Sequence, residues 1–483
     1  MALQVYNTLH RRKEPFTPRH DGRVGIYVCG PTVYGHSHLG HAKSYVSFDV
    51  IVRHLRSLGY AVLYVQNITD VGHLTDDADQ GEDKLAKQAR IDRIHPMQLA
   101  ETYTRSYYED MDALNVLRPD IAPRASGHIT EQITIVQELI AKGMAYVVNG
   151  SVYFDVSSFP AYGKLSGRTV EDLNAGARVE IKEEKRHPAD FALWKKAEPG
   201  HIMRWPSPWG EGFPGWHIEC SAMSMKYLGE EFDIHGGGLE NQFPHHECEI
   251  AQSEGATGKQ FVRYWLHNNM VTVDGKKMGK SLGNFLTLKD AFAKWDPQVV
   301  RFFILQSHYR STLDFSDEAL DGARAGHEKL VNTLRNLRER IDSSTAAGED
   351  PGIDLVRRTA EFREAMDDDF NTPQAIAVLF DLARELNQAF AREKNFTRAS
   401  LEAVERWYEM HAGTVLGIKT GESRGAERSG TLVGPLVELL LAIRSEIRAQ
   451  KLWALSDKIR DGLAGIGIGL EDKKTGTIWK RIS

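Results

Sequence analysis

Three histidines, His36, His38 and His41, stand in a short polar stretch that follows an apolar run at residues 24–29. After His41 the apolar residues recur at helical spacing up to Gly59, which predicts a helix that begins near the histidines. Two imidazoles three residues apart in the first turn of a helix lie on one face. They could donate hydrogen bonds to a phosphate whose charge grows in a transition state. A surface loop that happens to contain three histidines explains the same residues, and on this stretch alone it is the slightly favoured interpretation.

The elements around this stretch indicate a parallel sheet. Residues 24–29 and 61–65 are apolar runs with the β-branched and aromatic content of buried strands. With the helix between them they make a βαβ unit. Open α/β sheets bind ligands at the carboxyl ends of their strands, which is where the histidines lie. The stretch contains neither GxGxxG nor GxxxxGK[ST], so it is neither a dinucleotide fingerprint nor a Walker loop.

A second candidate for phosphate chemistry is the polar segment DGKKMGKSLGNF at residues 274–285, hereafter the lysine loop. It holds Lys277 and Lys280 on either side of Gly279. Lysine is a point charge on a flexible stem, which suits it to follow a leaving pyrophosphate. A solvated basic turn is the commoner meaning of such a run. Pairing with the histidine stretch overturns that interpretation, and Lys280 is then our choice for the main phosphate contact, with Lys277 second.

Possible metal ligands are scattered along the chain: Cys29, Cys220, His245, Cys248 and Glu249. His245 and Glu249 are four residues apart on a helix that Pro244 is expected to start, so they point to one side. Two thiolates, an imidazole and a carboxylate suit Zn²⁺. Buried apolar cysteines and a histidine at a helix start are an equally good explanation, because no CxxC pair is present. The HHECEI segment is not a His-Glu-x-x-His site, since position 250 is Ile.

Several segments together carry a resemblance to a known family. His38-Leu39-Gly40-His41 resembles the "HIGH" signature of class I aminoacyl-tRNA synthetases, and residues 277–281, KMGKS, resemble the "KMSKS" signature with Gly279 in place of the usual Ser. The pair in this order is far more specific than either alone. The chain resembles the cysteinyl-tRNA synthetase family from about residue 5 to residue 479 through these segments: YVCGPTVYGHSHLGHA (27–42), GWHIECSAM (215–223), DIHGGGLENQFPHHECEIAQSE (233–254), HYRS (308–311) and MDDDFNTPQA (366–375).

The resemblance implies roles for individual residues. It assigns one Zn²⁺ per chain to Cys29, Cys220, His245 and Glu249, with the substrate thiol bound directly to the metal. Cys248, next to Glu249, should face about a quarter-turn away and be a bystander. It implies catalytic roles for His38, His41, Lys277 and Lys280. It implies contacts with cysteine or ATP for these residues: Thr32, Gly40, Thr69, Trp216, His235, Gly237 and Lys280.

The chain also departs from the family pattern. Gly279 replaces a Ser, Glu240 stands where Asp is common, and Asn241-Gln242 replace an apolar pair. After Asp70 the sequence is acidic and unlike the family, so no role beyond Asp70 is carried over. The acidic run is expected to be a surface loop that leads into a helix.

The activity that the resemblance implies is ATP-dependent ligation of L-cysteine to tRNA(Cys) through a cysteinyl-adenylate, with Mg²⁺ accompanying ATP. One alternative is a cysteine ligase with the same catalytic half and an amino-sugar acceptor, but such relatives lack the full carboxyl-terminal half. Another is a non-catalytic RNA-binding protein descended from a synthetase. No signature histidine or lysine is lost, which argues against it.

Composition narrows the class of protein. The chain has 483 residues, 41% of them apolar and 26% charged, and a net charge of −6. A chain of this length predicts several domains. No stretch approaches ~20 apolar residues, so no membrane span is expected, and the start shows no apolar secretory segment. Three cysteines fit a reducing cytoplasm rather than a disulfide framework. The acidic balance means that any RNA contact must come from local basic surface.

The pattern along the chain predicts an α/β protein with a Rossmann-like parallel-sheet catalytic domain that contains an insertion, followed by a helical bundle and a small anticodon-binding unit. Helices are expected at about 92–118, at 299–311 and at 437–450, and Leu330, Leu334 and Leu337 mark one apolar stripe of the bundle. The terminal residues 431–483 carry nine Lys or Arg against six Asp or Glu, which is suggestive of RNA contact. The family suggests a monomer. The predicted limits are 1–126 and 205–255 for the catalytic domain, 127–204 for the insertion, 256–315 for a linking fold with the lysine loop, 316–413 for the bundle, 414–435 for a linker and 436–483 for the anticodon-binding unit.

Overall fold

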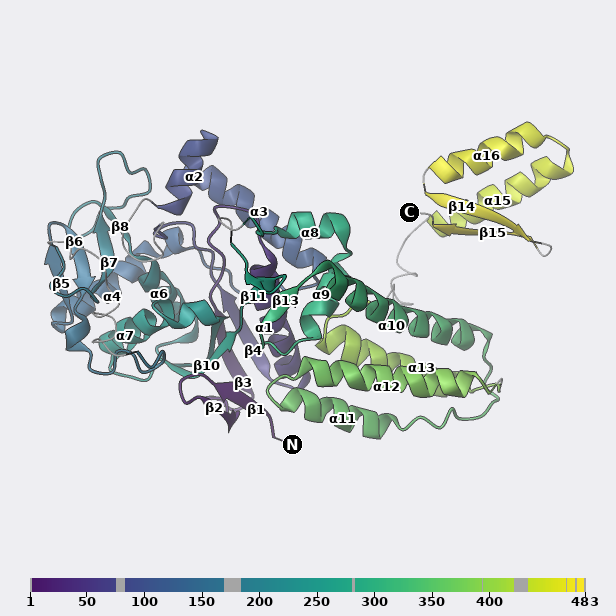
Figure 1. The fold of residues 1–483 in the computed structure, drawn as a ribbon, viewed down its shortest axis with the longest axis horizontal. Coiled ribbons are helices and arrows are strands. Elements are labelled where there is room, and N and C mark those ends of the chain that lie inside the picture. Colours follow the sequence, from purple (N-terminus) through teal and green to yellow (C-terminus); the bar gives the residue numbers. More distant parts are fainter. Residues whose placement is uncertain are drawn as a thin grey trace. The chain divides into compact units, whose positions relative to one another are not determined.

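The computed structural model divides the chain into two compact units, Met1–Thr420 and Gly421–Ser483 (Figure 1). It describes residues 2–74, 83–168, 184–279, 283–392, 394–420, 433–465, 467–473 and 476–481. The acidic run that follows His73-Leu74 and the predicted phosphate contact Lys280 lie outside these residues.

The centre of the first unit is a parallel sheet with strand order β10-β9-β3-β4. Every neighbouring pair is parallel, with Ile26 opposite both Tyr64 and Ile234. The predicted βαβ unit is confirmed, and Gly59 follows its helix with a φ of 91°. The elements are β3 (Arg23–Val28), α1 (Leu39–Ser57), β4 (Ala61–Gln66), β9 (Phe232–Gly238) and β10 (Val262–Asn268). Strand β10 lies beyond residue 255, so the sheet extends past the predicted end of the catalytic domain.

The predicted insertion contains a second sheet, which is antiparallel with the order β5-β6-β7-β8. Its last strand lies beyond residue 204, since β8 pairs with β7 through Trp194 and Pro214. Helices α6 and α7 follow this sheet in the chain and pack on each other and on α4. The elements are η1 (Ala125–His128), α4 (Ile129–Ala141), β5 (Ala145–Val148), β6 (Ser151–Phe154), η2 (Val156–Ser158), β7 (Phe191–Lys196), β8 (Gly212–Pro214), α6 (Trp216–Leu228), η3 (Leu239–Gln242) and α7 (His245–Thr257).

The lysine loop belongs to a three-stranded sheet with the order β12-β11-β13. The remaining elements of this region are β1 (Gln4–Asn7), β2 (Arg12–Pro15), α2 (Lys84–Asp92), α3 (Pro96–Ala113), β11 (Val271–Val273), β12 (Lys276–Lys277), α8 (Leu288–Lys294), α9 (Pro297–Leu305) and β13 (Leu313–Phe315). Two helix predictions were wrong in extent. The helix expected at 92–118 is α3, which runs only from Pro96 to Ala113, because α2 ends at Asp92, Arg93 has a left-handed φ of 56° and Pro96 starts the next helix. The helix expected at 299–311 ends at Leu305.

The bundle that follows begins at Ser316, whose side chain caps α10. The predicted stripe of Leu330, Leu334 and Leu337 is buried. The helices are α10 (Asp317–Ser343), α11 (Leu355–Asp367), α12 (Thr372–Phe390), α13 (Arg398–Tyr408) and the π-helical η5 (Glu409–Val415). Residues 414–420, predicted to begin a linker, belong to the first unit.

The second unit has its own small apolar core, formed by Val437, Leu441, Leu463 and Ile468. Helix α15 (Val433–Ala449) starts a turn earlier than the sequence suggested, and α16 (Trp453–Gly465) precedes a hairpin of β14 (Ile468–Lys473) and β15 (Gly476–Arg481). In neither unit does a described helix combine the length and the apolar character that crossing a membrane requires.

Candidate active site and metal centre

A cavity of about 600 Å³ opens at the carboxyl ends of β3 and β9. It brings together most of the residues singled out from the sequence: Cys29, Thr32, His38, Gly40, His41, Thr69, Trp216, Cys220 and His245. A larger cavity of about 1400 Å³ lies beside α2 and β7 and contains none of them. The smaller cavity is therefore the candidate active site, because the chemistry gathers there.

The two signature histidines form the start of α1. His38 is the residue before the first turn, and its Nδ1 accepts a hydrogen bond from the amide of Gly40 at 3.1 Å. The Nδ1 of His41 accepts from the amide of His38 at 3.2 Å. With Nδ1 as acceptor, the ring proton of each neutral imidazole is on Nε2. The rings stack at 3.9 Å, and burial lowers the pKa of His41 well below its usual value, so His41 is a neutral donor.

The glycine at position 40 is explained by the close approach of the His38 ring to its backbone. A Cβ at this position would lie 2.9 Å from Cε1 of His38 and 3.9 Å from Cε of Met278. Any side chain here would push the His38 ring out of place and fill the space beside the lysine loop.

The carboxyl-terminal end of the lysine loop and the residues after it lie against the stretch that holds His36, His38 and His41, hereafter the histidine loop. The amide of Leu288 donates to the carbonyl of Ser37 at 2.8 Å, and the ring of Phe285 contacts that of His38 at 5.3 Å. Lys277 is exposed at the end of β12 and does not line the cavity. The structure therefore joins the two signatures through the flanks of the lysine loop.

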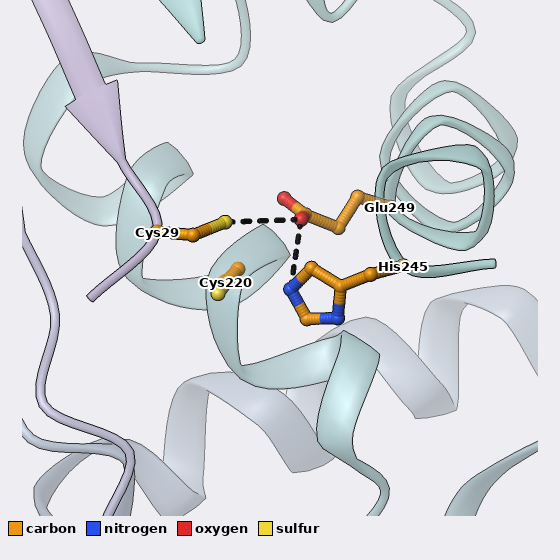
Figure 2. A group of neighbouring side chains, drawn as sticks. All are labelled: Cys29, Cys220, His245 and Glu249. Carbon is orange, nitrogen blue, oxygen red and sulfur yellow. Dashed lines mark hydrogen bonds and ion pairs between the residues drawn. The ribbon is translucent and has the colours of Figure 1, made fainter. Parts of the chain in front are cut away.

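The predicted metal ligands converge on one point (Figure 2). One donor atom from each of Cys29, Cys220, His245 and Glu249 lies within 4.8 Å of the others, and all four residues are buried. Cys29 directly follows β3, Cys220 is on α6, and the other two occupy one face of α7. Nε2 of His245 lies 3.2 Å from Oε1 of Glu249, and Sγ of Cys29 lies 3.9 Å from the same oxygen.

The donor set fits a divalent cation. Burial raises the pKa of the Cys29 thiol to about 11 and also raises the pKa values of Cys220 and Glu249. Burial lowers the pKa of His245. Burial thus disfavours the charged forms of these groups, and a cation among them would stabilise two thiolates and a carboxylate. Two sulfurs, one nitrogen and one oxygen are ligands that Zn²⁺ accepts.

A second group of donors shares two of these residues. Cys29, His235, His246 and Glu249 also lie within 4.8 Å of one another. His246 already binds His267 through Nδ1 at 2.8 Å, and His235 binds Oε2 of Glu249 at 2.8 Å. Because the group with Cys220 offers two thiolates, it is the better match to zinc, and His235 and His246 support it from behind.

The predicted substrate contacts divide into two sets. Thr32, Thr69 and Trp216 line the cavity, whereas His235 and Gly237 do not. His235 is fully buried against Trp265 at a ring distance of 4.5 Å. A Cβ on Gly237 would lie 2.8 Å from the ring of His246. These two residues lie beside the candidate metal ligands and support them. Their contact with substrate stays a prediction.

Cys248 faces the insertion. Its sulfur lies 3.4 Å from the hydroxyl of Tyr162, and it packs in the core formed between α7 and the antiparallel sheet. This position agrees with the expected bystander role.

Sequence reasoning missed His73. Its ring stacks on Trp216 at 3.9 Å with an angle of 9°, and its Nδ1 lies 2.6 Å from the hydroxyl of Thr32. It lies three residues after Asp70, where the resemblance was no longer followed. The departing residues Glu240 and Asn241 also line the cavity. Only their place just after the glycines of β9 could have indicated this.

Comparison with known proteins decides the family. The family described as tRNA synthetases class I (C) catalytic domain matches residues 15–325, and the DALR domain matches residues 361–419. A cysteine--tRNA ligase of Chlorobaculum tepidum is 58% identical over 489 residues, covering 99% of both chains. The chain belongs to the cysteine--tRNA ligase family. The enzyme is also 53% identical to the cysteine--tRNA ligase of Deinococcus radiodurans, over 99% of this chain and 97% of that one.

A solved structure supports the fold alone. Mycobacterium tuberculosis methionyl-tRNA synthetase in complex with methionyl-adenylate gives a TM-score of 0.57 at 14% identity, over 82% of this chain and 91% of that one. The class I fold predicted from the sequence is thus confirmed, with its parallel sheet and helical region.

Proposed function

We propose that the enzyme joins L-cysteine to tRNA(Cys) in two steps through a cysteinyl-adenylate. The observation that carries the proposal is a single cavity that holds both a pair of imidazole donors and a buried thiolate-rich donor set. The imidazoles suit phosphate chemistry, and the donor set suits recognition of a thiol. We also propose that the enzyme is a monomer and that it is located in the cytoplasm.

In the first step the cysteine carboxylate attacks the α-phosphorus of ATP, which arrives with Mg²⁺, and pyrophosphate leaves. Negative charge grows on the phosphate oxygens in the transition state. His38 and His41 hold Nε2 protons because their Nδ1 atoms are occupied by backbone amides. Neutral donors of fixed orientation stabilise that charge without reorganising. Lys280 and Lys277 are proposed to follow the pyrophosphate.

Cys29, Cys220, His245 and Glu249 would hold Zn²⁺, which when bound supplies a Lewis acid that prefers a thiolate to a neutral hydroxyl. Cysteine and serine differ by one atom, and a pocket that measures only size discriminates weakly between them. Trp216 stacks on His73 at 3.9 Å and contacts the ring of His245 at 4.3 Å with an angle of 35°, so it forms an aromatic wall next to the donor set. Thr69, whose hydroxyl donates to Glu219 at 2.6 Å, is the polar group of that pocket.

In the second step a hydroxyl of the terminal ribose of the tRNA attacks the carbonyl carbon of the cysteinyl-adenylate, and the cysteinyl ester forms as AMP leaves and the hydroxyl loses its proton. We assign anticodon contact to the unit Gly421–Ser483, which has its own core and a local excess of basic residues. Deleting residues 436–483 should then abolish most tRNA charging and spare adenylate formation.

Two measurements test the proposal. ATP–pyrophosphate exchange should depend on cysteine and be at least ~10²-fold weaker with serine, because a zinc ion at the donor set would prefer a thiolate to a neutral hydroxyl. Charging of bulk tRNA with labelled cysteine should follow. Exchange without charging of any tRNA would indicate a different acceptor, and absence of exchange would indicate a binding protein.

A further inference from the structure

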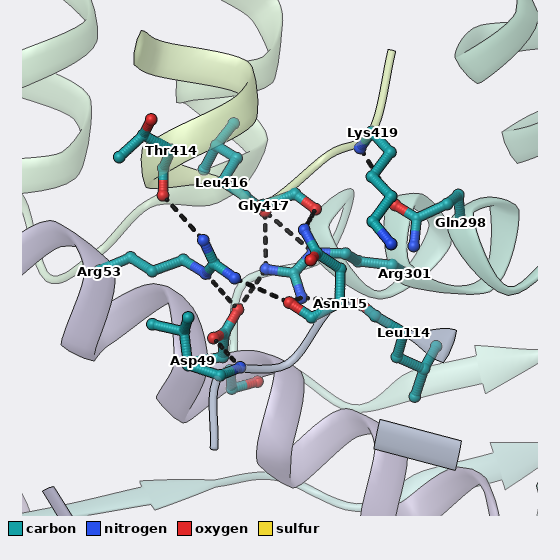
Figure 3. A network of polar contacts seen from close by, with 12 residues as sticks. Asp49, Arg53, Leu114, Asn115, Gln298, Arg301, Thr414, Leu416, Gly417 and Lys419 are labelled. Carbon is teal, nitrogen blue, oxygen red and sulfur yellow. Dashed lines mark hydrogen bonds and ion pairs between the residues drawn. The ribbon is translucent and has the colours of Figure 1, made fainter. Parts of the chain in front are cut away.

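One side chain joins four segments of the first unit, and none of its partners lines the substrate cavity. Arg301 on α9 is fully buried. Its Nε and Nη2 donate to the carbonyl of Leu416 at 2.9 and 2.7 Å, and its Nη1 donates to the carbonyls of Leu114 and Asn115 at 3.0 and 3.1 Å. Nη2 also donates to the carboxylate of Asp49 on α1 (Figure 3).

The charges of this cluster are balanced in an unusual way. Asp49 pairs with Arg301 and also with Arg53 at 2.8 Å, so two guanidinium groups share one carboxylate. The remaining positive charge faces the carbonyls of Leu114 and Leu416, which are the C-cap residues of α3 and of η5. The last carbonyls of a helix lack intrahelical partners and carry partial negative charge. Arg301 therefore caps two helices at once while it is paired with a third.

The segment held here is the end of the first unit. The side chain of Asn115 donates to the carbonyl of Gly417 at 2.8 Å, Arg53 donates to that of Thr414 at 3.1 Å, and the amide of Lys419 donates to Gln298 at 3.1 Å. Residues 414–420, hereafter the exit segment, are the last of the first unit before the chain continues to Gly421–Ser483.

The helices at the other side of Arg301 lead to the two signature loops. Helix α1 starts at His38. Helix α3 holds the histidine loop through Ser106, whose hydroxyl lies 2.8 Å from Nδ1 of His36. It also holds α8, which follows the lysine loop, through an ion pair of Asp110 with Lys289 at 3.0 Å. One guanidinium thus connects the exit segment to the helices that carry the signatures.

We propose that Arg301 is a positioning residue that sets where the exit segment leaves the catalytic unit relative to the signature loops, and that it is needed for charging tRNA rather than for forming the adenylate. This inference rests on the proposed function. A tRNA held through the C-terminal unit reaches the cavity at an effective concentration that depends on where its tether starts. Cysteine and ATP, which bind in the cavity alone, do not depend on that point.

Gly417 allows a test that substitutes neither Arg301 nor any residue of α1. It has a φ of +62°, and an added Cβ would lie 2.6 Å from Cζ of Arg301. Gly417→Ala should therefore push the exit segment off the guanidinium. Gly413→Ala is the matched control, four residues earlier in η5, where an added Cβ meets nothing within 4 Å. Gln298→Met is a second disruption, since it removes the acceptor for Lys419 at nearly constant volume.

In the full-length enzyme, Gly417→Ala and Gln298→Met should each lower kcat/KM for tRNA by ~10-fold or more, and keep ATP–pyrophosphate exchange within about twofold. Gly413→Ala should leave both activities unchanged. Thermal midpoints identify variants that fold. Equal loss of exchange and charging would mean that the cluster only stabilises the fold, and full charging by folded variants would mean that the exit point does not matter. Either result overturns the inference. A wild-type enzyme that charges no tRNA would instead refute the proposed function.

Discussion

The candidate metal centre and the lysine loop, to which we assign different parts of one reaction, are built in opposite ways. The four metal-ligand candidates are all buried, and each comes from a helix or directly follows a strand. In the lysine loop, Lys276 and Lys277 are exposed, and Gly275 and Gly283 have φ values of +73° and +68°. Recognition of a single atom requires donors that are fixed before substrate arrives. Contact with a leaving pyrophosphate requires cations that can move with it.

The histidine loop shares the cavity with the metal-ligand candidates and contacts the end of the lysine loop. Substitutions in it should have the largest effect on adenylate formation. His41→Asn or His38→Ala should lower the rate of ATP–pyrophosphate exchange by ~10²–10³, the usual scale for losing one donor to a transition-state charge. Cysteine binding, followed by calorimetry, should change little because the metal centre is untouched. An exchange rate equal to that of wild type, or loss of the fold, would contradict the catalytic assignment of these histidines.

Substitutions in the metal centre should weaken recognition of cysteine rather than slow the chemical step. Cys220→Ser should lower zinc content below one ion per chain and raise the apparent KM for cysteine by about 10–10². Cys248→Ser is the matched control, because Cys248 contacts Tyr162 and not the donor group. It should keep both zinc and cysteine activation. Zinc lost from Cys248→Ser and kept in Cys220→Ser would reverse the ligand assignment.

Substitutions in the lysine loop should have a smaller effect, and they should change KM for ATP or the exchange rate rather than KM for cysteine. Lys280→Ala and Lys277→Ala should each raise KM for ATP or lower the exchange rate by ~10-fold, since each removes one mobile charge from the leaving group. Lys276→Ala is the control, because neighbouring residues of strand β12 point to opposite sides. Cysteine binding should be unaffected in all three. If Lys276 matters as much as Lys277, the loop acts through overall charge and not through placed contacts.

The same contrast explains what the sequence could predict. The strands, α1 and the bundle stripe were predictable because burial imposes a period on apolar residues. The convergence of Cys29, Cys220, His245 and Glu249 follows from no spacing rule, since three segments must meet. It was predicted only through the family resemblance.

Other features depended on tertiary contacts that a linear pattern does not contain. His73 joins the site through a stack on Trp216 and a hydrogen bond to Thr32. Arg301 stands in an apolar helix pattern, and its partners lie more than a hundred residues away along the chain. The left-handed φ of Arg93, which ends α2, is not marked by its residue type, whereas Pro96 at the start of α3 is a recognisable signal.

The smallest effect is expected at Lys43, which joins α1 to the sheet that carries the lysine loop. This lysine on α1 is buried, and its Nζ donates to the carbonyls of Met270 at 3.2 Å and of Ser311. These carbonyls adjoin β11 and precede β13, in the sheet that carries the lysine loop. Lys43→Met should therefore raise KM for ATP by about two- to fivefold and leave KM for cysteine unchanged, because only the base of the lysine loop loses a tether.

Lys43 also has a pH signature that tests its burial independently of activity. Burial lowers its pKa to about 8, against the opposing charge of Glu240. In the unfolded chain the amine keeps its proton up to about pH 10.4. Between these values the unfolded state binds more protons, so this group makes the free energy of unfolding rise with pH. Denaturant unfolding of wild type and Lys43→Met from about pH 7.5 to about pH 9.5 should show the wild type gaining about 1–2 kcal/mol relative to the variant. A constant difference across that range would mean that Lys43 titrates as an exposed lysine and does not tie the lysine loop to α1.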